Sequence, residues 1–149
     1  MNYKASLIIP IFNEINTLET LCNKLNEAFR NTKIKYIFVD DGSSDGSADW
    51  LNKNLQTFFK IKDIELISLK KNYGKGYAIR EGIKKVEGKH TIFIDSDLEY
   101  DPEDIFEMYN VVIKNKNISV LYGSRNLGTK IQLRRYFLNA IAVKLNTFI

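Results

Sequence analysis

The sequence predicts an α/β domain with a mainly parallel sheet flanked by helices. Short runs of β-branched and aromatic residues alternate with segments that carry apolar residues at helical spacing. The runs are almost continuously apolar, which is typical of strands buried on both faces, and the short connections favour right-handed β-α-β units. At 149 residues, with 44% hydrophobic and 27% charged residues, the chain has the size and composition of one compact domain.

Five runs are predicted as strands, and three of the segments between them have an apolar face at helical spacing. The predicted strands are 5–11, 34–40, 64–69, 90–95 and 118–123. The first apolar face carries Leu18, Leu21, Cys22, Leu25 and Phe29; later faces carry Ile79, Gly82, Ile83 and Val86, and then Ile105, Met108, Tyr109 and Val112.

Two helix starts are marked by capping residues. Asn16 with Glu19 resembles a capping box. Asp101 followed by Pro102 predicts an N-cap and a proline at the first helical position. The acidic residues of this second start therefore have a structural explanation, and no chemistry is assigned to them.

Cys22 and His90 are each the only residue of their type. A single cysteine allows no internal disulfide, which favours a reducing compartment, and the helical spacing around Cys22 predicts a buried thiol rather than a nucleophile. His90 opens an apolar run with no second ligand nearby, so we expect a solvated residue at a strand start.

The net charge of +4 and the pI of about 9.0 suit an anionic partner without identifying it. No signal peptide is expected, because the first apolar run is short and ends in Asn13 and Glu14. No run reaches the roughly 18 apolar residues that cross a bilayer, so we expect these residues to be soluble.

Three carboxylates, Asp95, Asp97 and Glu99, follow the fourth predicted strand and are not explained by capping. The carboxyl ends of parallel strands are where open α/β sheets bind ligands. If the extended conformation persists, alternation puts all three side chains on one side. Such oxygens suit Mg²⁺ or Mn²⁺, but a solvated acidic turn explains the D-x-D spacing equally well.

Loops after the other predicted strands favour the ligand interpretation. They carry polar or glycine-rich residues: "PIFNE" (10–14), "VDDGSSDGS" (39–47), "NYGKGYA" (72–78, with Lys75 at a helix start that can receive phosphate) and "YGSRN" with Arg125. In a parallel sheet these ends share one edge.

Competing motifs fail on spacing. Position 79 is Ile, so "GKGYAI" does not match the dinucleotide fingerprint G-x-G-x-x-G, and neither a P-loop nor G-x-S-x-G is present. "DDGSSDG" partly matches a calcium loop, but its twelfth position is Asn52 instead of Glu.

The five segments "SLIIPIFNE", "FVDDGSSDGS", "NYGKGYAIREGI", "IDSDLEYDPEDI" and "YGSR" occur in the order found in family 2 glycosyltransferases of the GT-A fold. The version around Asp95 most resembles the polyprenyl-phosphate branch, which includes dolichol-phosphate mannosyltransferases. The resemblance covers roughly residues 5–126 and implies a Rossmann-like, nucleotide-sugar-binding GT-A domain.

The resemblance implies an inverting, metal-dependent transfer of a sugar from a GDP- or UDP-linked donor to a polyprenyl (dolichyl or undecaprenyl) phosphate, with Mg²⁺ or Mn²⁺ as cofactor. It assigns Asp97 and Glu99 as the nearest metal ligands and Asp95 closer to nucleotide and sugar. The family often has Gln at the position of Glu99. The implied donor-binding residues are Pro10, Phe12, Glu14, Val39, Asp41, Asp95, Ser96, Asp97 and Arg125; the implied catalytic residues are Asp95, Asp97 and Arg125; and the implied acceptor-phosphate residues are Arg125 with Arg135 or Arg134.

Two alternative functions remain open. One is a family 2 enzyme with a sugar hydroxyl acceptor in polysaccharide or glycolipid synthesis, and the other is a non-catalytic nucleotide-sugar-binding subunit. A phosphate acceptor needs no strong base, and the chain offers no clear dedicated base, which favours the lipid-phosphate branch. Nucleic acid is not expected as a partner, because acidic loops would repel it.

Residues 129–149 predict a basic amphipathic helix, which suits either a membrane interface or packing within the domain. We expect residues 1–128 to form the GT-A-like part, and 129–149 to begin an acceptor or membrane-proximal region of the same domain. Family members normally continue beyond this point, so we expect a C-terminally truncated chain. The resemblance places the full-length protein at the cytoplasmic face of a membrane and leaves open whether this fragment is active.

Overall fold

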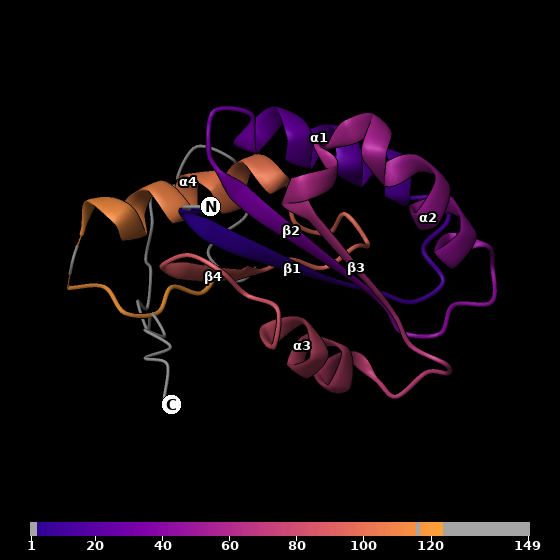
Figure 1. The fold of residues 1–149 in the computed structure, drawn as a ribbon. Coiled ribbons are helices and arrows are strands. Elements are labelled where there is room, and N and C mark those ends of the chain that lie inside the picture. Colours follow the sequence, from indigo (N-terminus) through magenta and orange to yellow (C-terminus); the bar gives the residue numbers. More distant parts are fainter. Residues whose placement is uncertain (1–2, 116, 124–149) are drawn as a thin grey trace.

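The computed structural model describes residues 3–115 and 117–123, and in this part of the chain four strands form one parallel sheet. Their order is β3-β2-β1-β4 (Figure 1). Register pairs Ile9 with Phe38 across the β1–β2 ladder, and Ile8 with Phe93 across the β1–β4 ladder. The strands are β1 (Ala5–Ile11), β2 (Ile34–Asp40), β3 (Ile64–Ser68) and β4 (His90–Phe93).

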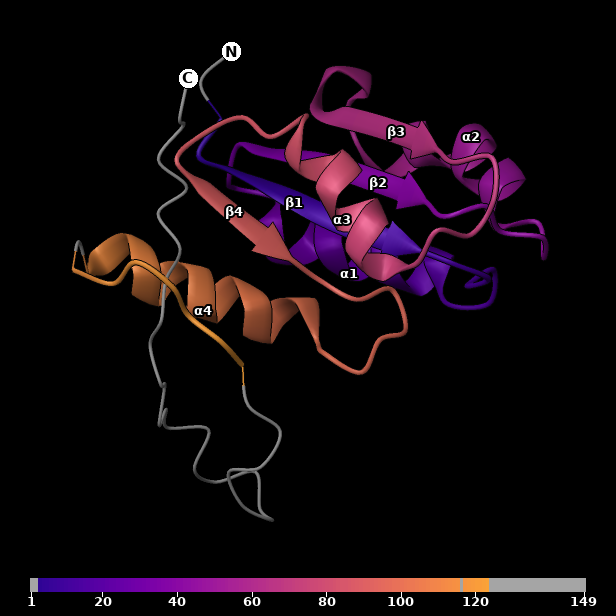
Figure 2. The same ribbon diagram turned by 90° about the horizontal axis from the view of Figure 1, so that it is seen from below.

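Helices cover both faces of the sheet. They are α1 (Leu18–Phe29), α2 (Ser47–Phe58), the short 3-10 helix η1 (Ile61–Asp63), α3 (Lys75–Ile83) and α4 (Pro102–Lys114). Figure 1 shows α1, α2 and α4 on one face and α3 alone on the other, and Figure 2 shows α3 lying over β1 and β2. Alternate residues of β1 serve the two layers: Leu7 and Ile9 join the larger core, whereas Ile8 joins Ile37, Val39 and Ala78 under α3.

The predicted parallel α/β fold is confirmed, but the strands differ from the prediction in burial, in bounds and in number. The runs 64–69 and 90–95 form strands only as far as Ser68 and Phe93. Continuous burial holds for β1 and nearly all of β2, but β3 and β4 are only half-buried along most of their length because they are the edge strands of this sheet. The predicted fifth strand, 118–123, is wrong for the residues described: only Val120 there makes a bridge. Strand composition alone does not create a ladder, since a partner strand must also be in place.

One predicted helix cap is confirmed and the other is wrong. The Asp101 side chain accepts a hydrogen bond from the Glu103 N–H at 3.1 Å, and Pro102 follows at the start of α4. Helix α1 instead begins after Thr17, not Asn16, and has no side-chain cap. The Thr17 hydroxyl donates to the backbone and side-chain oxygens of Glu14, at 3.0 and 2.9 Å, so it stabilises the preceding loop.

The connections define where the sheet can bind a ligand. Helices α1 and α2 follow β1 and β2 on one face, whereas α3 leads back across the other face to β4, on the far side of β1. The loops after β1 and β4 therefore diverge at a topological switch point, where open α/β sheets form their crevice. Within the described ranges, no helix is both long and apolar enough to cross a bilayer.

Candidate functional site

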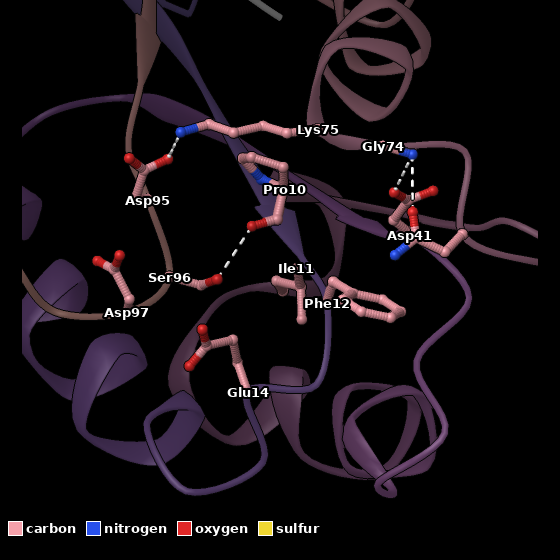
Figure 3. A pocket seen from close by; sticks show the side chains of 11 residues that line it. Pro10, Ile11, Phe12, Glu14, Asp41, Gly74, Lys75, Asp95, Ser96 and Asp97 are labelled. Atoms are coloured by element: carbon pink, nitrogen blue, oxygen red, sulfur yellow. Dashed lines mark hydrogen bonds and ion pairs between the residues drawn. The ribbon is translucent and has the colours of Figure 1, made fainter.

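A cavity of about 260 Å³ lies at the switch point between the ends of β1 and β4 (Figure 3). The loops that follow β2 and β3 close its other side. Its lining residues are Pro10, Ile11, Phe12, Glu14, Asp41, Asn72, Gly74, Lys75, Asp95, Ser96 and Asp97. The sequence thus places polar residues from four separate loops around one space.

Asp41 holds the loop that follows β3. Its side chain is only 2% exposed, and its carboxylate accepts hydrogen bonds from the backbone N–H groups of Tyr73 at 2.9 Å and Gly74 at 2.8 Å. The neighbouring Gly42 has φ +71°, and a Cβ there would lie 2.4 Å from the carbonyl carbon of Lys71. Only glycine fits this approach, so the two loops meet directly.

The loops after β1 and β2 are joined by side-chain hydrogen bonds. The Ser47 hydroxyl accepts from the Glu14 N–H at 3.0 Å and donates to Asp45 at 2.6 Å. The other Asp45 oxygen accepts from the Ile15 N–H at 3.0 Å. Burial would raise the pKa of Asp45, but these hydrogen bonds from Ser47 and Ile15 outweigh it and hold the pKa below its usual value. Asp45 therefore positions the Glu14 loop.

Two residues after β4 connect to opposite walls of the cavity. The buried Ser96 hydroxyl donates to the Pro10 carbonyl oxygen at 3.0 Å, which ties this loop to β1. Asp95 forms an ion pair with Lys75, the first residue of α3, and Figure 3 shows the lysine side chain reaching across to it. The neighbouring residues Asp95 and Ser96 therefore connect this loop to different walls of the cavity.

The third carboxylate of the predicted trio does not reach the cavity. The strand ends at Phe93, and Leu98 has φ +63°, so the extended alternation expected for 95, 97 and 99 breaks in the turn. Asp97 lines the cavity and accepts from the Glu99 N–H at 3.0 Å, whereas Glu99 is absent from the lining. No three His, Cys, Asp or Glu side chains are grouped as a ready metal site anywhere in the described part.

Seven predicted site residues line the cavity, whereas Val39 and Glu99, the other predicted residues that the structure describes, do not. Val39 is fully buried under α3 with Ala78, because alternation along β2 turns it to that face. Arg125, Arg134 and Arg135, like the helix predicted over 129–149, lie outside the described residues. The seven are Pro10, Phe12, Glu14, Asp41, Asp95, Ser96 and Asp97.

Four lining residues were not among the predicted site residues: Ile11, Asn72, Gly74 and Lys75. The last three belong to the loop 72–78, which the sequence already marked as glycine-rich and placed after a strand. The signal for them was this position at the carboxyl edge of the sheet. The contacts of Gly74 with Asp41 and of Lys75 with Asp95 required the tertiary structure.

Cys22 and His90 lie away from the cavity lining. Cys22 is fully buried in the core, and burial raises the pKa of its thiol to about 12, which confirms the predicted core thiol. His90 begins β4 as expected but is half-buried rather than solvated, with its ring edge-on to Tyr109. Burial, and then Lys89, lower its pKa.

The donor set in the cavity fits a divalent cation that is shared with a phosphorylated ligand. Asp95 and Asp97 are consecutive carboxylates on one wall, and Glu14 lies on the facing loop (Figure 3). Mg²⁺ is commonly held by one or two carboxylates together with substrate phosphates, so a full protein cage is not needed. Phe12, which is 43% exposed, adds an aromatic surface to the lining on the side of Asp41.

Solved structures of other proteins share the fold of this chain. The crystal structure of Staphylococcus aureus TarS residues 1–349 in complex with UDP-GlcNAc matches with a TM-score of 0.65 and 22% identity, over 89% of this chain and 38% of that one. The mannosyltransferase PcManGT from Pyrobaculum calidifontis, in complex with GDP-Man and Mn²⁺, matches with a TM-score of 0.65 and 19% identity, over 81% and 34%. Both support the GT-A fold.

Curated relatives are closer in sequence. An uncharacterized glycosyltransferase of Synechocystis is 36% identical over 110 residues, which are 72% of this chain and 34% of that protein. The undecaprenyl-phosphate 4-deoxy-4-formamido-L-arabinose transferase of Proteus mirabilis is 37% identical over 106 residues, 68% and 31% respectively. The chain spans about a third of the length of these relatives. The sequence pattern of "Glycosyl transferase family 2" matches residues 6–144, and the chain belongs to that family of glycosyltransferases.

Proposed function

We propose that the chain is the donor-binding domain of an inverting, metal-dependent transferase that moves a sugar from a nucleotide-diphosphate sugar to a polyprenyl phosphate. The observation that carries this proposal is the cavity at the switch point, where Asp95 and Asp97 face the loops of Phe12, Glu14 and Asp41. The names of the undecaprenyl-phosphate transferases among the relatives support the acceptor class.

Each wall of the cavity has a task in this proposal. Phe12 and Glu14 receive the nucleoside, in a loop that Ser47 and Asp45 hold in place. Asp41 orders the 72–74 loop against this wall through its two backbone hydrogen bonds. Asp97 and Asp95 are the residues that would hold Mg²⁺ or Mn²⁺. When bound, such an ion supplies positive charge that offsets the growing negative charge of the leaving nucleoside diphosphate.

The acceptor side of the proposal concerns the whole protein. A phosphate acceptor is already anionic near neutral pH, so attack on the sugar needs no strong general base. Arg125 and Arg134 or Arg135 remain predicted phosphate contacts. Association with the cytoplasmic face of a membrane, where a polyprenyl phosphate resides, is part of the same proposal. Activity on undecaprenyl phosphate, compared with oligosaccharide acceptors, tests this half.

Asp97→Asn tests the donor half. It should weaken Mn²⁺-dependent binding of UDP- or GDP-sugars at least about tenfold, because a neutral amide binds a divalent cation more weakly than a carboxylate does. Isothermal titration calorimetry with and without Mn²⁺ measures this. Glu99→Gln is the matched control: it removes a nearby exposed carboxylate that does not line the cavity and should leave binding unchanged. Equal donor affinity in Asp97→Asn and the native chain would refute the metal role.

A further inference from the structure

Lys75 is the only basic residue among the described residues that line the cavity. It is the first residue of α3, and its ammonium group pairs with Asp95 from the loop after β4. Asp95 is also one of the two carboxylates that fit a divalent cation. The ammonium group of Lys75 is therefore paired with Asp95, a carboxylate that we propose binds the divalent cation (Figure 3).

Stability does not explain a lysine at this position. The positive end of the helix macrodipole lies at the first turn of a helix, where acidic residues stabilise and basic residues do not. The Lys75 side chain is 59% exposed, and ion pairs this exposed contribute little to folding. The lysine and the helix terminus are positive groups at a cavity wall that also carries carboxylates, and a helix start of this kind can receive an anion.

The lysine can move without disturbing the fold. Its flexible stem carries a single charged group, and more than half of the side chain is exposed to solvent. The backbone of this loop is held separately, by the hydrogen bond from Gly74 to Asp41. Release of Asp95 therefore changes one side-chain contact and leaves the cavity wall in place.

We propose that Lys75 is an exchangeable counter-ion: it neutralises Asp95 in the free protein and moves to the diphosphate of the donor when a divalent cation takes Asp95. This inference rests on the proposed function and adds a residue to it. Lys75 then couples two events, because the cation that displaces the lysine also frees it to bind phosphate. Each ligand should favour binding of the other.

Lys75→Met separates this role from a structural one, because it changes two affinities in opposite directions. Without the competing ammonium, Mn²⁺ alone should bind about two- to fivefold more tightly, the range expected for an exposed ion pair. UDP or GDP with Mn²⁺ should bind about tenfold more weakly, since a charge-assisted hydrogen bond to phosphate is lost. Uridine and guanosine, which lack phosphate, should bind the variant and the native chain equally.

Calorimetry on the 149-residue chain measures these affinities, with Lys70→Met as the control, an exposed lysine that does not line the cavity. Lys75→Arg, which keeps the charge, should retain diphosphate binding. If the native chain binds UDP or GDP with Mn²⁺ and Lys75→Met binds Mn²⁺ and diphosphate as the native chain does, the counter-ion role is overturned while the proposed function stands. Loss of both affinities with a lower melting temperature would also overturn it. No Mn²⁺-dependent binding by the native chain would overturn the proposed function, and this inference with it.

Discussion

The carboxylates around the cavity differ in the hydrogen bonds and ion pairs that they form within the protein. Asp41 is buried and satisfied by two backbone N–H groups, and Asp45 is held by Ser47 and Ile15. Asp95, within the part of the chain that the structure describes, pairs with Lys75, the proposed exchangeable counter-ion. Asp41 and Asp45 therefore shape the site, whereas Asp95 is available for exchange with a ligand.

Asp41→Ala should lower the free energy of unfolding by about 1–3 kcal/mol, because the N–H groups of Tyr73 and Gly74 lose a charged acceptor. Asp41→Asn keeps one acceptor oxygen and should lose less. Urea denaturation of both variants measures the difference. Two variants as stable as the native chain would show that the loop does not depend on this carboxylate.

Helix α3, which begins at Lys75, lies close against the sheet at Gly82. Gly82 faces β1 and β2: a Cβ added there would lie 2.7 Å from Ile8 Cγ2 and 3.3 Å from Val39 Cγ2. The helix buries Ala78 and Gly82 and keeps its larger side chains at the margins of this contact. Small residues thus determine the spacing of this layer.

Gly82→Ala should destabilise the protein by about 1–3 kcal/mol, because the added methyl group overpacks the contact with Ile8. Gly76→Ala lies in the same helix with nothing within 4 Å of the added Cβ, so it should be neutral or stabilise by up to about 1 kcal/mol through helix propensity. Thermal unfolding of the pair checks the sign. A destabilised Gly76→Ala beside an unaffected Gly82→Ala would contradict this packing account.

At the scale of the whole molecule, the site depends on the strand order: β2 and β3 follow β1 on one side, and β4 lies on the other side of β1. Its residues come from segments 10–14, 41, 72–75 and 95–97, and no two of these segments adjoin in the sequence. A ligand that contacts all of them links β1, β2, α3 and the loop after β4. Binding should therefore stabilise the fold as a unit.

UDP or GDP together with Mn²⁺ should raise the melting temperature more than either alone. At a concentration 100 times the dissociation constant, a ligand stabilises the native state by about 2.7 kcal/mol, which for a chain of this size corresponds to roughly 5–10 °C. Differential scanning fluorimetry measures the shift. Asp97→Asn should reduce the Mn²⁺-dependent part by about half or more, because a ligand that binds tenfold more weakly stabilises by only about 1.4 kcal/mol at the same concentration. A full shift in that variant would place the cation elsewhere.

Local patterns in the sequence determined the elements and the position of the site. The apolar runs 5–11 and 34–40 became strands with those bounds, Asp101 with Pro102 opened α4, and the polar loops after the strands met at one edge. These outcomes depend on neighbours in the sequence and on the direction of parallel strands. Residues 90–95 show the limit, because the strand itself ends at Phe93.

Tertiary structure alone decided which side chains meet. The left-handed turn at Leu98 keeps Glu99 out of the cavity lining. Helix α1 begins after Thr17 and not after Asn16, and the run 118–123 makes a bridge only at Val120 among the residues described. The contact of Lys75 with Asp95 joins two loops that are twenty residues apart. Such contacts depend on strand order and loop conformation, which arise from packing across the whole sheet and leave no local pattern in the sequence.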